Sequence, residues 1–296
     1  MMRVPSTEGV RVAVHELGGR SDGAPLLVSH ATGFHGRCYA PLVREFAGGF
    51  RCFGLDYRGH GETPADPEWR VDWRRFGDDA LAVAEHIAPD GGLVGFGHSM
   101  GGTALLMAAH REPERFDRLV LFEPISHEGS RPALTEDEIR RFPIVVGETR
   151  RRRRFASFDD AYDNYRDKPP LSSMTEESLR GYVDHGFEPV QDPDGAAAVE
   201  LRCSPDLEAD IFVTGITNGV WELLPEIRTP TLVLGGHVEE RQPSAQSEAI
   251  ADRLPDGRYL LLDHQTHFGP FSHPAEIAGL VAGVAGRAGD ATTSGP

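Results

Sequence analysis

Ser99 is the side chain in this sequence whose surroundings best suit a nucleophile. It stands in the run Gly97-His98-Ser99-Met100-Gly101, after an apolar stretch at 93–96 and before a helix-prone stretch at 103–110. A serine on a sharp strand-to-helix turn adopts a strained backbone that exposes its hydroxyl, and small neighbours relieve the crowding. The hydroxyl alone is a weak nucleophile, so a base, an orienting acid and oxyanion donors must come from elsewhere in the chain.

Two histidines follow the last strand that we expect, at 259–262, and either is placed to act as the base. His267 is favoured and His264 is the alternative. A histidine that comes last in the chain fits the order serine, acid, histidine used by hydrolases with this kind of turn. The sequence therefore predicts that His267 accepts the proton of Ser99.

Short apolar segments alternate with helix-compatible segments along most of the chain. The strand-length runs lie at 10–17, 26–29, 52–55, 93–96, 119–122, 231–234 and 259–262. The helix-compatible runs lie at 42–46, 76–87, 103–110, 244–254 and 275–284. This alternation predicts an α/β fold, with a mostly parallel sheet covered by helices on both faces.

The alternation stops in the middle of the chain, which predicts an insertion. We expect a core formed by residues 1–125 and 229–287 and an inserted, mainly helical cap at 126–228. Cap helices are expected at 136–142, 158–166 and 176–185. Because the insertion follows the carboxyl end of a strand, where open α/β sheets bind ligands, it would cover the site. Residues 288–296 are rich in small residues and are expected to form a disordered tail.

Four motifs together resemble those of the α/β-hydrolase superfamily, and the cap-bearing serine hydrolases and esterases are the most similar subgroup. The motifs are Gly97 to Gly101, His30-Ala31-Thr32-Gly33-Phe34, Asp56-Tyr57-Arg58-Gly59-His60-Gly61 and His267-Phe268-Gly269-Pro270. Each follows an expected strand, and the resemblance extends over nearly the whole chain. It implies the α/β-hydrolase fold, a catalytic triad and an oxyanion hole.

The resemblance also implies which backbone amides stabilise the oxyanion. Thr32 matches the donor of the family's early turn, although Ala31 stands where the family usually has glycine. Met100 follows the nucleophile at a helix amino terminus, where the dipole favours negative charge. Other residues of these motifs are interpreted as hydrogen-bonding groups that hold the turns, namely His30, Asp56, Arg58 and His60.

Two glutamates are candidates for the acid. In the family's commonest arrangement the acid follows the strand at 231–234, where this sequence offers Glu239 in a run that resembles a solvated loop. Some members, haloalkane dehalogenases among them, carry it after the preceding core strand, which here is followed by Glu123. A buried carboxylate there needs a specific partner, such as an imidazole N–H or an arginine of the cap. We favour Glu123 and keep Glu239 as the alternative.

These residues predict a serine hydrolase that cleaves a carboxylic ester, thioester or lactone of a small, hydrophobic substrate through an acyl-enzyme, with no cofactor and no metal. Alternatives are a carbon–carbon bond hydrolase or lyase on the same triad, an acyl transferase, and a non-catalytic relative that binds a small ligand. Dehalogenase and epoxide-hydrolase chemistry is disfavoured, because it needs an aspartate nucleophile where Ser99 stands.

Composition limits the possible partners. The 296 residues carry a formal net charge of −16, which disfavours binding to nucleic acid or to anionic membranes. No stretch approaches 18 apolar residues, and the first residues lack the apolar core of a signal peptide. Three widely separated cysteines suggest neither a disulfide framework nor a zinc site. We therefore expect a cytoplasmic monomer or homodimer whose partner is a small-molecule substrate.

Two features of the cap each have two interpretations. The five arginines at 150–154 form either a solvated face that clamps neighbouring carboxylates or a rim that selects anionic substrates. Its aromatic residues form either the core of the cap or the lining of an acyl pocket. The aromatic residues concerned are Phe155, Tyr162, Tyr165, Phe187 and Trp221.

Overall fold

One sheet of eight strands forms the centre of the described chain, in the order β1-β2-β4-β3-β5-β6-β10-β11. The computed structural model describes all residues except 47–48, 129–133, 192–193, 241 and 287–296, so the expected tail at 288–296 lies outside the described residues. The strands are β1 (Met2–Pro5), β2 (Arg11–Gly19), β3 (Ala24–Ser29), β4 (Phe50–Asp56), β5 (Leu93–His98), β6 (Phe116–Phe122), β10 (Thr231–Gly235) and β11 (Gly257–Leu261). Only the pairs β1–β2 and β2–β4 of this sheet are antiparallel. The mostly parallel α/β sheet is therefore confirmed.

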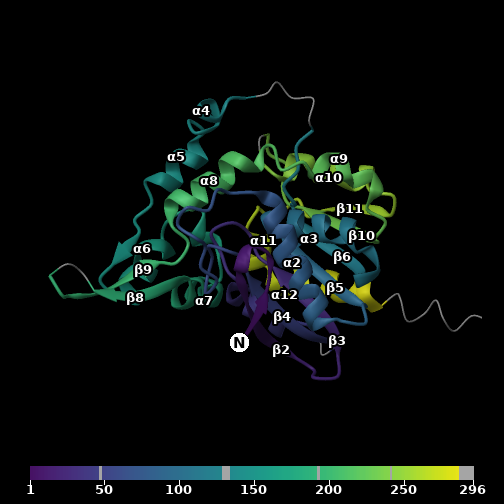
Figure 1. Cartoon of the computed structure of the whole chain (residues 1–296), viewed down its shortest axis with the longest axis horizontal. Coiled ribbons are helices and arrows are strands. Elements are labelled where there is room, and N and C mark those ends of the chain that lie inside the picture. The colour runs from purple at the N-terminus through teal and green to yellow at the C-terminus, as the bar shows by residue number, and fades with distance from the viewer. Residues whose placement is uncertain (47–48, 129–133, 192–193, 241, 287–296) are drawn as a thin grey trace, which may run out of the picture.

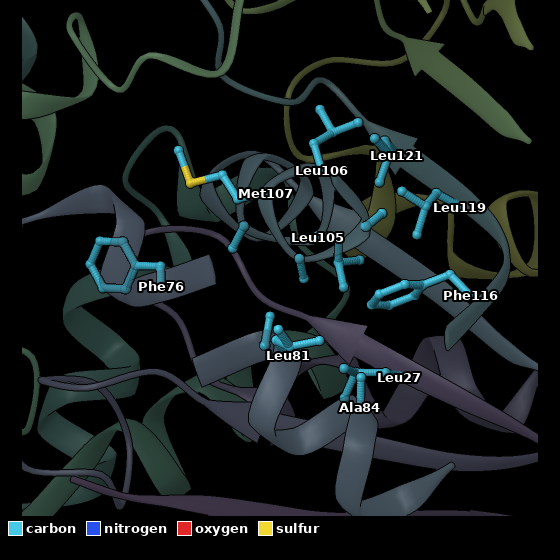
Figure 2. Packing of buried hydrophobic residues seen from close by; sticks show 14 of the residues in the cluster. Leu27, Phe76, Leu81, Ala84, Leu105, Leu106, Met107, Phe116, Leu119 and Leu121 are labelled. Carbon is cyan, nitrogen blue, oxygen red and sulfur yellow. The ribbon is translucent and has the colours of Figure 1, made fainter. Parts of the chain in front are cut away.

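Helices cover both faces of this sheet. One face packs against α2 (Trp73–Ile87), α3 (Met100–Arg111) and α10 (Ser244–Arg253), and the other against α1 (Ala40–Arg44) and α12 (Pro274–Gly286). Because side chains alternate along a strand, Leu27 of β3 joins the first core, whereas Leu26 and Val28 join the second. Figure 2 shows Leu105 of α3 among side chains of α2, β3 and β6 in the first core.

The segment between β6 and β10, called the inserted segment below, lies beside the core sheet in Figure 1. Its helices are α4 (Glu136–Ile139), α5 (Pro143–Thr149), α6 (Phe158–Arg166), α7 (Glu176–Gly186), α8 (Pro205–Gly215) and α9 (Val220–Leu223). The helix expected at 136–142 ends at Ile139, because Phe142 precedes a proline and is extended, and Pro143 begins α5.

A small antiparallel sheet, which the sequence did not predict, accompanies the helices of the inserted segment. It consists of β7 (Arg154–Phe155), β9 (Ala197–Leu201) and β8 (Phe187–Gln191), in that order. β7 has two residues and pairs with residues more than forty positions away, so local periodicity could not reveal it. Among the described residues, no helix is long and apolar enough to cross a membrane.

Helix α8 fastens the inserted segment to the core. Trp73 Nε1 donates hydrogen bonds to Ile211 O at 3.3 Å and to Thr214 Oγ1 at 3.1 Å. At the other end of α8, a Cβ built on Gly33 would lie 2.0 Å from Glu208 Oε1. Gly33 has φ +77°, so both its conformation and this close approach require glycine. The early turn that contains Thr32 is therefore packed directly against the inserted segment.

Candidate active site

Ser99 occupies the turn between β5 and α3 with φ 53° and ψ −119°, a conformation that side-chain-bearing residues rarely adopt. Two glycines allow α3 to begin against the strands. A Cβ at Gly97 would lie 2.6 Å from Gly102 Cα, and one at Gly101 would lie 2.2 Å from Ser29 O. The strained serine turn that the sequence predicts is thus present.

Glu123 and His267 meet beside this turn, although they are 144 residues apart. Glu123 directly follows β6, is 1% exposed and lies 2.5 Å from His267 Nδ1 through its Oε2. Its Oε1 accepts a hydrogen bond from Gly236 N–H at 2.7 Å. A carboxylate only accepts, so Nδ1–H is the donor of this pair, and Nε2 is the ring nitrogen left to act as a base.

The two alternative residues lie elsewhere. Glu239 is exposed, and its backbone N–H donates to Ser244 Oγ at 3.2 Å. His264 is also exposed, and its Nε2 lies 2.8 Å from Glu276 Oε2. Among the described residues, neither side chain forms a hydrogen bond or ion pair with Glu123 or His267.

A buried hydrogen-bond chain through His98, which sequence reasoning missed, connects the early turn to the His267 loop. Ala31 N–H donates to Tyr39 Oη at 3.1 Å, and Tyr39 Oη lies 2.8 Å from His98 Nδ1. His98 Nε2 lies 2.9 Å from His267 O, so Nε2–H donates and Nδ1 accepts. Burial lowers the pKa of His98 well below its ordinary value, and His267 lowers it further. His98 is therefore a neutral residue that links Tyr39 to the His267 loop by hydrogen bonds. Its position next to Ser99 in the sequence was the one feature that could have indicated this role.

Thr32 and Met100 are the residues that the resemblance implies as oxyanion donors. Thr32 lines the same cavity as Ser99, and Met100 is the first residue of α3. Among the described residues, neither backbone N–H donates a hydrogen bond. Amide donors without a hydrogen-bond partner remain available to bind a developing negative charge.

Ser99 opens into a cavity of about 160 Å³ between the core and the inserted segment. The core side contributes Thr32, Trp73 and Ser99, and the loop after β6 contributes Pro124, Ile125, Ser126 and His127. The inserted segment contributes mainly apolar side chains, namely Ile139, Phe142, Ile144, Val145, Phe212 and Ile216. The wall is completed by Gly215, Gln242, Pro243 and Gln246.

The aromatic residues considered for this lining lie elsewhere. Phe155, Tyr165 and Phe187 contact one another inside the inserted segment, with Phe155 and Phe187 ring centroids 5.7 Å apart. Tyr162 is buried in the same cluster, and Trp221 packs against the core beneath Arg253. The structure therefore favours the interpretation that these aromatic residues form packing contacts over the interpretation that they line an acyl pocket.

The turn-holding residues make dense polar contacts. Arg58 is 1% exposed and binds both carboxylate oxygens of Asp79, at 2.9 and 2.7 Å. Asp56 accepts from Gly36 N–H at 2.9 Å and from Glu62 N–H at 2.8 Å. His30 Nε2 accepts from Tyr57 N–H at 3.0 Å. These contacts fix the loops without reaching the cavity of Ser99. No group of three His, Cys, Asp or Glu side chains in the described residues is arranged to hold a metal ion.

Arginines of the 150–154 run pair with carboxylates. Arg151 Nη1 donates to Glu208 Oε2 at 2.8 Å and to Glu148 Oε2 at 3.2 Å, and its Nη2 hydrogen-bonds Tyr182 Oη. Arg153 and Arg154 both contact Glu200. None of the arginines in the run lines the cavity of Ser99, which favours the clamp over the anion-selecting rim.

We expect Glu208→Gln to flatten the dependence of stability on pH. Burial raises the pKa of Glu208 from 4.5 to about 7; Arg151 opposes this rise and Glu148 adds to it. The folded state therefore holds this proton more tightly than the unfolded state, and the associated stability is lost as pH rises from about 4.5 through 7. The measurement is the free energy of unfolding from urea titrations at pH 5 and pH 8. Its decrease from pH 5 to pH 8 should be smaller in Glu208→Gln than in the wild type, by roughly 1–3 kcal/mol.

The exposed Glu240→Gln is the matched control for this measurement and should reproduce the wild-type slope. A slope for Glu208→Gln equal to that of the wild type would show that Glu208 does not gain a proton on folding.

The chain is similar to known proteins in both sequence and fold. The model of the alpha/beta hydrolase family matches residues 26–280. The chain is 27% identical over 263 residues to a pimeloyl-(acyl-carrier protein) methyl ester esterase of Aromatoleum aromaticum, covering 88% of this chain and 97% of that protein. It is 26% identical over 269 residues to a lipase of Mycobacterium tuberculosis, covering 89% and 94%. A peroxisomal α/β-hydrolase of Saccharomyces cerevisiae has the same fold, with a TM-score of 0.74, 14% identity and coverage of 99% and 86%.

Proposed function

Because this chain belongs to the alpha/beta hydrolase family, we propose that it is a serine hydrolase that cleaves carboxylic ester, thioester or lactone bonds through an acyl-enzyme. The observation that carries the proposal is the buried Glu123 carboxylate hydrogen-bonded to His267 beside the Ser99 turn. The two relatives above, described as an esterase and a lipase, support ester chemistry.

In the first half of the proposed reaction, Ser99 Oγ attacks the substrate carbonyl while His267 Nε2 takes the serine proton. Glu123 keeps Nδ1–H in place and stabilises the imidazolium that forms. The amides of Thr32 and Met100 bind the oxyanion, and His267 then protonates the leaving oxygen or sulfur. In the second half, water loses a proton to His267 and attacks the acyl-enzyme, which releases the acid and restores the serine.

Proton transfer requires a contact that forms on substrate binding. No hydrogen bond joins Ser99 to His267 in the part of the chain that the structure describes. The ring of His267 nevertheless lies 4.9 Å from that of His98, the residue before the nucleophile. Catalytic hydrogen bonds are often long without substrate and tighten in the Michaelis complex, which is compatible with this geometry.

The cavity limits the substrate group that fits beside Ser99. Its volume of about 160 Å³ is close to that of a cavity that holds benzene, and most of its wall is apolar. We propose that the inserted segment acts as a cap over this cavity and that the bound group is short and mainly hydrophobic.

A fluorophosphonate probe tests the proposal. We expect a stoichiometric adduct on the peptide that contains Ser99, identified by mass spectrometry, and no adduct on Ser99→Ala. Hydrolysis of phenyl butyrate with release of free acid would distinguish a hydrolase from a ligand-binding relative that labels without turnover. Absence of labelling, or labelling that persists in Ser99→Ala, would refute the assignment of the nucleophile.

A further inference from the structure

We propose that the cavity beside Ser99 recognises a substrate group that ends in an uncharged hydrogen-bonding function such as a carboxamide, bound by Ser126 and Gln246. This inference rests on the proposed function and names the substrate class of the same site. Ser126 is a polar side chain that the proposed reaction does not use.

Ser126 is buried in the cavity wall without a hydrogen-bond partner. Its side chain is 1% exposed, and its Oγ has no partner among the described residues. An unpaired buried hydroxyl costs free energy, and native structures rarely keep one without a reason. Because Ser126 is one of the residues that line the cavity of Ser99, a substrate bound there can pair this hydroxyl.

The backbone before Ser126 is fixed. Thr103 Oγ1 donates to Ile125 O at 2.7 Å and accepts from Ile125 N–H at 2.9 Å. Asn218 Nδ2 donates to the same carbonyl at 3.0 Å. These three hydrogen bonds hold the loop after β6, so Ser126 is presented at a defined position rather than on a free loop.

Gln246 of α10 supplies a second polar group on the same wall. Its Nε2 lies 2.8 Å from His127 Nδ1, an orientation that leaves Oε1 as an acceptor. Gln246 and His127 line the cavity, together with Gln242. Ser126 can therefore donate to a carbonyl oxygen while Gln246 Oε1 accepts from an N–H. A carboxamide supplies both groups, since it has a C=O acceptor and an NH2 donor.

Apart from the imidazole of His127, whose Nδ1 accepts a hydrogen bond from Gln246, the described wall has no ionisable side chain. None of the described residues that line the cavity is Asp, Glu, Lys or Arg. A carboxylate or ammonium group would lose its hydration there without an opposite charge, whereas an amide loses less and regains hydrogen bonds. The cavity thus favours an uncharged polar end on a short apolar chain.

Three phenyl esters of equal length test this inference, with acyl groups that end in carboxamide, isopropyl and carboxylate: phenyl 6-amino-6-oxohexanoate, phenyl 6-methylheptanoate and monophenyl adipate. A second series of acetates places the same three ends on the alcohol, since either side of the ester can occupy the cavity. In one of the series we expect kcat/KM to be about tenfold higher for the carboxamide than for the isopropyl ester, and lowest for the carboxylate.

Two variants assign the effect to the proposed groups. Ser126→Ala and Gln246→Met should each lower kcat/KM for the favoured carboxamide several-fold to tenfold and leave that of the isopropyl ester within twofold. Ser126→Ala should not lower Tm, because its hydroxyl has no hydrogen bond to lose; a merely structural serine would lower it. The exposed Ser172→Ala is the matched control. It should change kcat/KM for neither the carboxamide ester nor the isopropyl ester.

The outcomes separate this inference from the proposed function. Two results would overturn the inference alone. One is turnover that depends on Ser99 but favours the isopropyl ester in both series. The other is an equal loss of kcat/KM on the carboxamide and isopropyl esters in Ser126→Ala. Absence of turnover on every ester would overturn the proposed function and this inference with it.

Discussion

Replacing Ser99 with alanine should lower kcat by about 10⁴- to 10⁶-fold while the protein remains folded. The loss is large because the acyl-enzyme cannot form, and the amides of Thr32 and Met100 then stabilise only a slow direct attack by water. Alanine fits the same strained turn as serine, so the circular dichroism spectrum and Tm should be close to those of the wild type. The measurement is kcat on a phenyl ester, with spontaneous hydrolysis subtracted.

The double variant Ser99→Ala/His267→Ala is the control for concerted action. Residues that act as one unit give strongly non-additive losses, so the double variant should be about as slow as either single variant. If the losses multiplied, Ser99 and His267 would act independently; if Ser99→Ala kept more than a hundredth of wild-type activity, another residue would be the nucleophile.

Much of the fold could be predicted because the core strands are short, continuous apolar runs. β5 is buried along its whole length, as expected of a strand covered on both faces. β6 begins at Phe116, whereas the predicted strand began at Leu119. The prediction started late because Asp117 and Arg118 interrupt the apolar run. β1 was missed because four residues at an edge carry little periodic signal.

The candidate site could be predicted where chemistry and chain order coincide. Ser99 and Glu123 each follow a predictable strand, and the carboxyl ends of parallel strands lie at one edge of the sheet. The choice between Glu123 and Glu239 needed three-dimensional placement, because both follow strands and only one is buried.

The cavity wall could not be predicted, because it depends on how the inserted segment packs. Phe155 and Phe187 are as apolar as Phe142 and Phe212, yet only the latter two line the cavity. The residue that suggests specificity, Ser126, is inconspicuous in the sequence. Its unpaired hydroxyl is visible only when the surrounding side chains are in place.

Glu123→Gln should lower kcat by about 10³- to 10⁴-fold, a far larger loss than for any substitution of Glu239. The glutamine carbonyl can still accept from Gly236 N–H, which directs its amide nitrogen to His267 Nδ1. An N–H donor there selects the tautomer with the proton on Nε2, so His267 can no longer accept the serine proton. Glutamine also cannot stabilise the imidazolium. The measurement is kcat across pH for both variants under identical conditions.

Glu239→Gln is the matched control, since it makes the same chemical change in an exposed turn. We expect its kcat to stay within twofold of the wild type, because its carboxylate contacts no described residue of the site. Intact folding of Glu123→Gln is checked by its Tm and by retained labelling at Ser99, which should be slower but still specific. If Glu239→Gln lost more activity than Glu123→Gln, the buried carboxylate would only support the loop, and the acid would have to reach His267 from the strand after the inserted segment.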